Sequence, residues 1–294
     1  MPRLYTIDFP MKPYYLLLLA CLVTTCNQHD FHPTFAVCGK LHEYPTVIKA
    51  GYDCMELIVG DFFVPDKSDA AFQANLDLMK QLNAKIISCM QFIPAYLKMT
   101  GPEARHDDII VWAETTFRRA QMAHIPYIVL GSGDARNVPD GFDRKVATQQ
   151  IIDLCIRMAP LAQKYDIIIL VEPLAKKYSN FIHTLAEGAA VVQAVNHPHV
   201  QLLCDIHHML REDEPPEEII KYGEYIRHCH IAEREYRTAP GKLGDDFRPY
   251  FKALQKINYQ GCISVEIDYI DGKYQWEDLE KELISALQYM KRNM

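Results

Sequence analysis

The chain has 294 residues and a formal charge of −7 at neutral pH. Apolar residues make up 49% of it and charged residues 23%, which provides enough apolar material for a packed core and gives no sign of disorder. The negative charge argues against a nucleic-acid partner, because such affinity comes largely from phosphates neutralised by Lys and Arg. The length suits one α/β barrel, whose usual size is roughly 250 residues.

The N-terminal segment differs from the rest of the chain. Lys12 precedes an apolar stretch of about ten residues, too short to span a bilayer, and small residues and Cys26 follow it. This is the pattern of an export signal of the bacterial lipoprotein kind. We therefore expect residues 1–30 to be a signal segment, with translation starting at Met11, Cys26 lipidated and the protein periplasmic or anchored to a membrane. A helix of a cytoplasmic enzyme is the alternative.

From residue 34 onward, short β-branched runs alternate with longer amphipathic stretches. The expected strands are 34–38, 54–59, 85–90, 127–130, 167–171, 200–204, 225–231 and 262–267. The expected helices are 44–50, 69–82, 108–123, 143–164, 183–195, 216–222, 246–257 and 276–291. Eight alternations predict right-handed crossovers and a closed (β/α)8 TIM barrel, which forms a single catalytic domain over residues 31–294. An open doubly wound sheet is the alternative, but the first strand–helix turn lacks its phosphate-binding glycines.

Four consecutive strands carry a metal-binding side chain at or next to their carboxyl end. These side chains are Glu172, Asp205, His230 and Glu266, separated by 33, 25 and 36 positions, about the length of one strand, one helix and two loops. The carboxyl ends of barrel strands meet at one end of the barrel, so we expect the four to converge there. Three carboxylates and an imidazole suit one hard or borderline divalent cation such as Mn²⁺, Mg²⁺ or Co²⁺, with Zn²⁺ as a further candidate.

Such a site predicts proton transfer next to a carbonyl group. The cation would polarise the carbonyl of a small carbohydrate substrate and stabilise an enediolate while a carboxylate removes the proton. We therefore predict a divalent-metal-dependent isomerase or epimerase of a ketose or sugar phosphate. A lyase or dehydratase acting by β-elimination on a keto-sugar or keto-glycoside is the alternative enzyme, and a non-catalytic carbohydrate-binding barrel is the alternative of another class. The oligomeric state stays open.

The same segments resemble the sugar phosphate isomerase/epimerase superfamily of xylose isomerase-like barrels, in particular its ketose 3-epimerase and hydroxypyruvate isomerase branches, over roughly residues 34–290. The resemblance implies that the four residues bind the metal. It implies that Glu172 and Glu266 also act as acid and base on opposite faces of the sugar. It further implies that His208, in the Asp-x-x-His motif, binds substrate oxygens, and that Arg237 clamps hydroxyls or a phosphate.

Three other residues lie close to these ligands in the predicted barrel. Glu56 at the end of the second strand is expected to bind substrate, with a structural ion pair as the alternative. Arg136 after the fourth strand is expected to meet a substrate hydroxyl, carboxylate or phosphate, or else to point outward from a tight turn. His228 shares the strand face of His230, which favours a supporting or core histidine over a fifth ligand.

Overall fold

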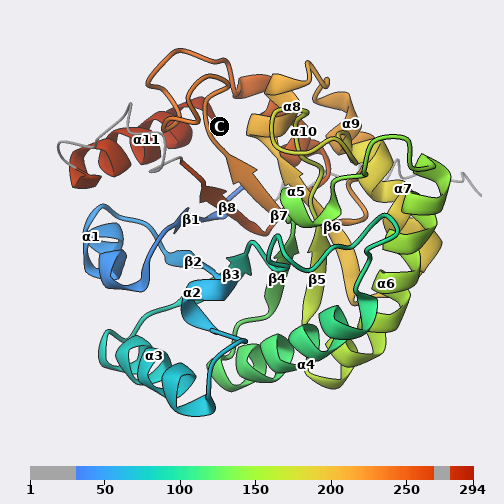
Figure 1. Cartoon of the computed structure of the whole chain (residues 1–294). Helices are drawn as coiled ribbons and strands as arrows, with labels where there is room; N and C mark the ends of the chain where they lie inside the picture. Colours follow the sequence, from blue (N-terminus) through green and yellow to red (C-terminus); the bar gives the residue numbers. More distant parts are fainter. Residues whose placement is uncertain (1–30, 268–278) are drawn as a thin grey trace, which may run out of the picture. The chain divides into compact units, whose positions relative to one another are not determined.

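The computed structural model describes residues 31–267 and 279–294, and Phe31–Met294 forms one compact unit. Eight parallel strands pair in chain order and close into a barrel between β8 and β1, which confirms the predicted TIM barrel (Figure 1). The strands are β1 (Thr34–Cys38), β2 (Cys54–Ile58), β3 (Ile86–Met90), β4 (Tyr127–Leu130), β5 (Ile168–Val171), β6 (Val200–Asp205), β7 (Ile226–Ile231) and β8 (Cys262–Val265). The predicted signal segment, Met11 and Cys26 lie outside the described residues.

Helices surround the strands in Figure 1. The eight that correspond to predicted helices are α1 (Tyr44–Lys49), α3 (Asp69–Gln81), α4 (His106–Ala123), α6 (Arg144–Lys164), α7 (Leu185–Val195), α9 (Glu217–Tyr222), α10 (Arg248–Lys256) and α11 (Leu279–Asn293). Four of the predicted first residues are outside their helices: Asp143 and Pro216 form the N-cap, and His183 and Asp246 precede it. Asp143 caps α6 by accepting a hydrogen bond from the Lys145 amide, and Thr184 caps α7.

Four short helices were not predicted from the sequence. They are η1 (Leu41–Glu43), α2 (Val59–Phe62), α5 (Gly133–Arg136) and α8 (Ile206–Arg211). One turn or so of helix is too short to show an apolar period, so the pattern that reveals longer helices is absent. Three of them, α2, α5 and α8, directly follow the carboxyl ends of β2, β4 and β6 and so help to build the end of the barrel where the predicted ligands lie.

Alternate residues of each strand face the barrel interior and the surrounding helices. Leu170 and Leu203 belong to a buried cluster inside the barrel, whereas their neighbours Ile169 and Leu202 belong to the larger core that contains residues of the helices. Because every second residue of a strand faces the same side, residue 172 faces the barrel interior like Leu170, and residue 205 faces it like Leu203. The pleat therefore directs the predicted ligands at those positions into the barrel mouth.

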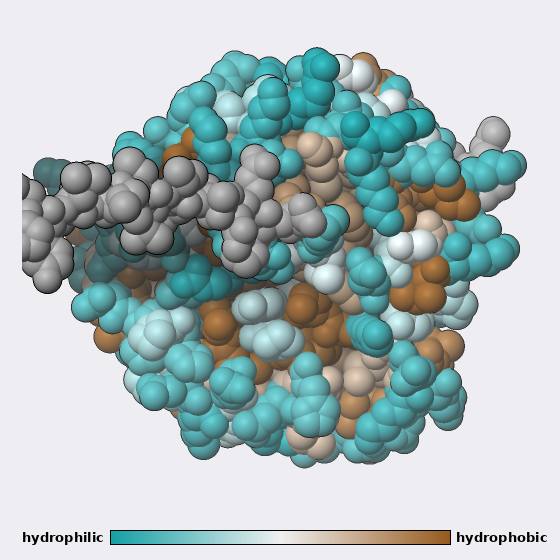
Figure 2. All heavy atoms as spheres, turned by 180° about the vertical axis from the view of Figure 1, so that it is seen from behind, coloured by the Kyte–Doolittle hydropathy of each residue, from teal (hydrophilic) through white to brown (hydrophobic). Residues whose placement is uncertain are grey.

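The outer surface is mostly polar. Figure 2 shows the face opposite to that of Figure 1, with hydrophilic side chains around the rim and smaller hydrophobic patches nearer the middle. Two of the most exposed large apolar side chains are Val111 at 68% and Tyr96 at 62%. Across residues 31–267 and 279–294, no helix has the length and apolar character needed to cross a membrane.

Candidate metal centre

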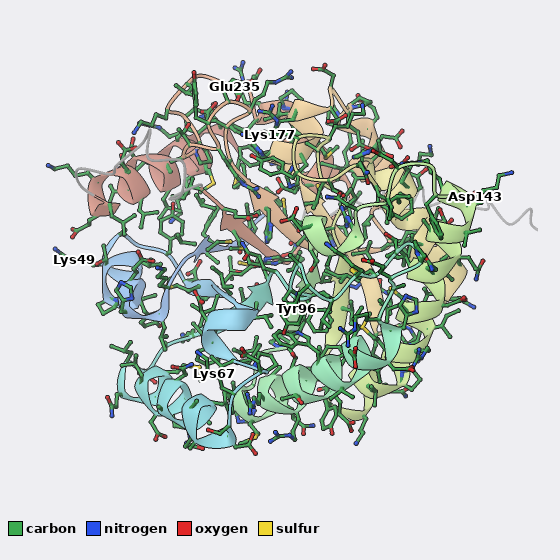
Figure 3. The ribbon with its side chains drawn as sticks, viewed as in Figure 1. Lys49, Lys67, Tyr96, Asp143, Lys177 and Glu235 are labelled. Atoms are coloured by element: carbon green, nitrogen blue, oxygen red, sulfur yellow. The ribbon has the colours of Figure 1, made fainter. Side chains whose placement is uncertain are left out.

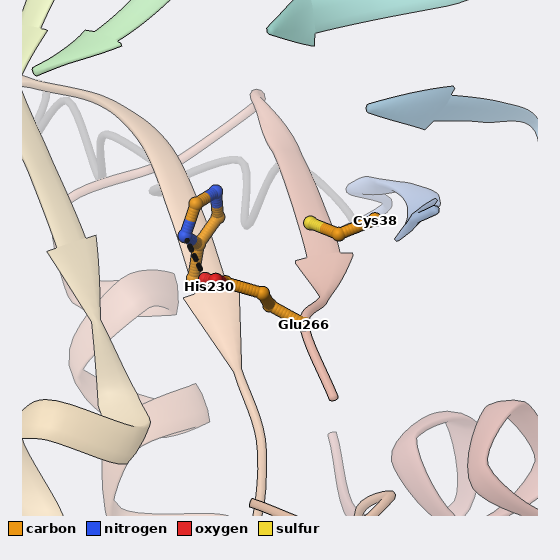
Figure 4. Close-up of side chains that lie close together, drawn as sticks. All are labelled: Cys38, His230 and Glu266. Atoms are coloured by element: carbon orange, nitrogen blue, oxygen red, sulfur yellow. Dashed lines mark ion pairs between the residues drawn. The ribbon is translucent and has the colours of Figure 1, made fainter. Parts of the chain in front are cut away.

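Glu172, Asp205, His230 and Glu266 converge at the carboxyl end of the barrel, as the sequence predicted. One potential ligand atom from each lies within 4.8 Å of the others. His230 Nδ1 is 3.2 Å from Glu172 Oε1 and 2.8 Å from Glu266 Oε2, and Figure 4 shows the second of these contacts. The imidazole therefore lies between two carboxylates that come from β5 and from the end of β8.

Arg237 reaches the same cluster from the loop after β7. Its Nη2 lies 2.5 Å from Glu266 Oε2 and 3.2 Å from Asp205 Oδ2. Burial favours the neutral guanidine, but these carboxylates outweigh it and raise the pKa of Arg237. Tyr236 and Arg237 have φ angles of 55° and 47°, a left-handed conformation that costs about 1–3 kcal/mol for such residues. The loop keeps this strained backbone where the guanidinium meets the cluster.

The cluster holds more negative than positive charge. Burial raises the pKa of Asp205 to about 7, against the pull of Arg237. Burial also acts to raise the pKa of Glu266, but Arg237 and His230 outweigh it and lower that pKa to about 2. Burial acts to lower the pKa of His230, yet Glu56 and Glu266 hold it well above its ordinary value. A divalent cation would offset this excess of carboxylates, so the residues fit a metal site.

Two other groups of potential ligands share His230, but they are less suited to a cation. Cys38 lies with His230 and Glu266 (Figure 4), and burial raises the pKa of its thiol well above the ordinary value, which keeps the poorer ligand form. Glu56 lies with His228 and His230, and both histidines are hydrogen-bonded to its carboxylate. The set of three carboxylates and Nδ1 of His230 is therefore the best candidate for a hard or borderline divalent ion.

Glu56 lies behind His230 and is fully buried. Its Oε1 and Oε2 are 3.1 and 3.0 Å from His230 Nε2, and Oε2 is 2.8 Å from His228 Nε2. Burial raises the pKa of Glu56, but the two histidines outweigh it and hold that pKa well below the ordinary value. A substrate contact was expected here from the sequence. The structure instead places Glu56 in the ion pair that was the alternative, on the ring nitrogen opposite the candidate ligand atom.

His208 is next to the cluster and has an unusual environment. Asp205 Oδ1 accepts hydrogen bonds from the amides of His207 and His208, which caps α8 and fixes the motif. His208 is 1% exposed, and neither ring nitrogen has a hydrogen-bond partner among the described residues, although Nε2 is 3.3 Å from Asp205 Oδ2. Burial holds its pKa well below the ordinary value, so the ring is neutral. A buried unsatisfied ring fits a residue that awaits a substrate oxygen.

Arg136 points inward and does not line the cavity formed by the described residues. It is 1% exposed, and it donates hydrogen bonds to the carbonyl oxygens of Glu172 at 2.7 Å and Ile182 at 3.2 Å. Burial lowers its pKa to about 10. Both sequence expectations, a substrate contact and an outward turn residue, therefore differ from the observed position. Arg136 instead fixes the backbone that carries the Glu172 side chain.

Gly131 also fixes the position of Glu172. A Cβ atom at Gly131 would lie 2.2 Å from Glu172 Oε2, far inside van der Waals contact. Any side chain at position 131 would therefore displace the carboxylate from the cluster. The close approach needs glycine at the end of β4, next to the strand that leads to Glu172.

A cavity of about 680 Å³ opens from the cluster. Its walls include the catalytic candidates Glu172 and Glu266, the predicted clamp Arg237, and Tyr178, which the sequence analysis missed. The Arg237 guanidinium lies 5.4 Å from the Tyr178 ring centre. The sequence gives one indication of this position: Tyr178 is an aromatic residue in the loop that follows Glu172, the candidate ligand after β5. The other lining residues are Ile58, Gly60, Asp61, Met90, Gln91, Ile93, Pro94, Ala95, Trp112, Ser132, Gly133, Asp134, Ala135, Leu174 and Lys177.

His207 was also missed, and it connects the loops around the cavity. Its Nε2 is 3.2 Å from the Tyr178 hydroxyl, and its Nδ1 is 2.8 Å from the carbonyl oxygen of Glu233. The Glu233 carboxylate in turn accepts hydrogen bonds from the amides of Gly241 and Asp245, which closes the loop that carries Arg237. Segments after β5, β6 and β7 are thereby held in one arrangement.

Comparison with known proteins places this geometry in a family. The chain is 25% identical over 263 residues to L-ribulose 3-epimerase of Methylomonas sp. strain DH-1, covering 83% of this chain and 88% of that protein. It is 28% identical over 113 residues to 3-dehydro-D-guloside 4-epimerase of Escherichia coli K12, covering 38% and 41%. The fold matches that of D-allulose 3-epimerase from Methylomonas sp. in complex with D-allulose, with a TM-score of 0.74, 20% identity and coverage of 89% and 97%.

These relatives are epimerases of small sugars, in agreement with the resemblance seen in the sequence. The match to a family model covers far more of the chain than any single motif, because it runs through nearly all of the barrel. Residues 46–293 match the family described as xylose isomerase-like TIM barrel, and the chain belongs to that family.

Proposed function

We propose that this chain isomerises or epimerises a ketose by moving a proton on the carbon next to the carbonyl group, with one divalent cation bound. One observation carries the proposal: the carboxylates of Glu172 and Glu266 approach the same imidazole and line the same cavity. The name of the relative that covers most of the chain, an L-ribulose 3-epimerase, supports this reaction class. A bound ketose would lie between two groups able to exchange protons with it.

Glu266 is the proposed base. Its ion pairs with Arg237 and His230 keep the carboxylate ionised and able to accept a proton from carbon. Glu172, carried by the segment after β5, is the proposed acid on the other face of the sugar. Return of a proton by Glu172 to the same carbon inverts it, which is epimerisation. Return of the proton by Glu266 to the former carbonyl carbon, together with transfer of the hydroxyl proton from the neighbouring oxygen to the former carbonyl oxygen, is isomerisation.

The remaining residues bind and orient. Glu172, Asp205, His230 Nδ1 and Glu266 would hold the cation, which when bound supplies stabilisation of the negative charge that develops on the carbonyl oxygen. Glu56 acts as a positioning residue, because its contact with Nε2 leaves Nδ1 facing the three carboxylates. Neutral His208 would donate a hydrogen bond to a substrate oxygen, and Arg237 would bind a hydroxyl at the cavity wall.

β-Elimination from a keto-glycoside is a second candidate, since it begins with the same proton removal. One observation favours it: a relative is named for a reaction on a dehydro-guloside, a substrate that carries a potential leaving group. The two reactions differ in the mass of the product. Isomerisation and epimerisation conserve mass, whereas elimination splits off water or the glycosidic partner.

Solvent exchange tests the proposal. The Mn²⁺-loaded protein is incubated in deuterated water with a panel of ketoses, and deuterium next to the carbonyl is followed by NMR and mass spectrometry. We expect exchange by the wild type and a loss of at least about 100-fold in Glu266→Gln. Glu224→Gln, a change at an exposed glutamate, is the matched control and should exchange normally. Full exchange by a folded Glu266→Gln protein would refute the role of Glu266.

A further inference from the structure

We propose that the outer part of the cavity binds a second, uncharged sugar ring, so that the substrate is a keto-sugar joined to another sugar and not a sugar phosphate. The inference rests on the proposed function and specifies its substrate class. Three observations carry it: the size of the cavity, the aromatic side chain of Trp112 at its outer end, and the sign of the charges there.

The cavity is larger than one sugar ring requires. Its volume is about 680 Å³, and cavities of roughly 300–1,000 Å³ hold ligands of drug size, which is the size range of a disaccharide. The reacting ring must lie at the inner end, against Glu172 and Glu266. Because one ring fills only this end, the part of the cavity that extends toward α2, α4 and α5 is left for a further group.

An aromatic side chain marks that outer end. Trp112 of α4 lines the cavity, and its Nε1 donates a 2.8 Å hydrogen bond to the Phe92 carbonyl oxygen, which fixes the indole ring. Tyr96, labelled in Figure 3, does not line the cavity itself; it packs edge to face against Trp112 with ring centres 6.4 Å apart and is 62% exposed. A fixed aromatic ring with an exposed neighbour gives the C–H face of a sugar an apolar surface to pack on.

The acidic residues at the outer end of the cavity favour an uncharged sugar ring over a phosphate group. Asp61 of α2 and Asp134 of α5 are exposed and line this part of the cavity. Their carboxylates can accept hydrogen bonds from sugar hydroxyls but would repel a phosphate. Of the described lining residues, Arg237 and Lys177 are the basic ones. Arg237 is paired with Glu266, and the Lys177 ammonium lies 5.2 Å from the Tyr178 ring centre, so neither belongs to the acidic end.

The test compares neutral and charged ketoses of one and two rings. Exchange of deuterium into fructose, fructose 6-phosphate and three ketose disaccharides (lactulose, isomaltulose and turanose) is measured with the Mn²⁺-loaded wild type. We expect kcat/KM for at least one disaccharide to exceed that for fructose by about tenfold or more, and fructose 6-phosphate to be the poorest substrate. Equal or better exchange with fructose, or the best exchange with the phosphate, would overturn the second-ring site.

Variants locate the effect in the cavity. Asp61→Asn removes one charge without changing size, and Trp112→Leu removes the aromatic ring that lines the cavity. Each should lower the ratio of disaccharide to fructose kcat/KM by about fivefold or more. Val111→Ala, at an exposed position one residue before Trp112, should leave the ratio unchanged. An unchanged ratio in both cavity variants would also overturn the inference, whereas exchange with no sugar at all would instead overturn the proposed function on which it rests.

Discussion

His230 is held between two sets of carboxylates, and this decides which of its nitrogens can bind a metal ion. Glu56 lies against Nε2, while Glu172 and Glu266 lie against Nδ1. A carboxylate behind a ligand imidazole fixes its orientation and makes the other nitrogen a better electron donor. Glu56 should therefore contribute to metal affinity although it is not itself in the ligand set.

Glu56→Gln tests this positioning role. The amide keeps the size of the side chain but removes its charge, so we expect the Kd for Mn²⁺, measured by titration calorimetry, to rise by about 10- to 100-fold. Glu214→Gln is the matched control, because Glu214 is also buried but accepts its hydrogen bond from the Leu185 amide, away from the cluster. Equal Mn²⁺ affinity in folded Glu56→Gln and wild-type proteins would rule out the role.

At the residue level, the candidate ligands were easier to predict than the residues that hold them in place. Glu172, Asp205 and Glu266 each follow or end an apolar strand, a pattern visible in the sequence. The position of Glu56 depends on His228, which lies 172 residues away in the chain, and that of Arg136 depends on the backbone oxygens it meets. Such partners are set by the closed barrel, and no local pattern in the sequence reveals them.

Strand alternation is the element-level feature that connects packing with the site. The same inward phase that buries Leu170 on β5 directs Glu172 to the mouth, and the same holds for Leu203 and Asp205 on β6. A strand shifted by one residue would turn its ligand toward the helices. The interior apolar cluster therefore keeps the register on which the candidate metal centre depends.

Leu170→Ala measures how much the apolar cluster inside the barrel contributes to the stability of the protein. Leu170 is fully buried, so we expect the free energy of unfolding, from urea titration, to fall by about 2–5 kcal/mol. Ile156→Ala on α6 is the control, since Ile156 is 46% exposed, and it should cost much less. Similar losses for the two variants would mean that the interior of the barrel is not tightly packed.

Helix lengths explain which elements the sequence predicted. The ends of the long amphipathic helices lay within a few residues of their predicted positions because several turns define an apolar face. The short helix α8 forms because Asp205 caps it through the amides of His207 and His208. That contact depends on a candidate ligand at the end of a strand, so the helix is a consequence of the site and shows no apolar period of its own.

For the molecule as a whole, the buried site makes the stability of the metal-free protein depend on pH. The pKa of Asp205 is raised to about 7, so between its ordinary value near 4 and 7 the folded chain binds a proton that the unfolded chain has released. Stability from this group is therefore lost as the pH rises through that window. The raised pKa of His230 acts in the same direction above its ordinary value, while the lowered pKa of Glu266 acts oppositely, below about pH 4.

The lowered pKa of His208 acts oppositely, below its ordinary value near 6.5, so the contribution of Asp205 is measured as a difference between the metal-free wild type and metal-free Asp205→Asn in urea unfolding with EDTA. Addition of Mn²⁺ should stabilise the protein more at pH 7.5, because the ion binds the deprotonated carboxylate. Between pH 5 and pH 7.5, the free energy of unfolding should change less favourably in the metal-free wild type than in Asp205→Asn. The same change in both proteins would show that Asp205 does not have a raised pKa.

The whole-molecule fold followed from chain length and from eight alternations of strand and helix, and the family match is consistent with both. The sequence did not predict the extent of the cavity, since its walls come from the ends of several strands and from short helices between them. Loops of this kind vary in sequence without a periodic pattern. The substrate class thus had to be inferred from the three-dimensional structure.

The most direct test is anomalous diffraction from crystals of the full chain soaked in Mn²⁺. We expect one strong manganese peak in the barrel, bonded to Glu172, Asp205, His230 Nδ1 and Glu266. A peak on the other side of His230, between Glu56 and His228, or no peak at this end of the barrel at millimolar Mn²⁺, would contradict this expectation.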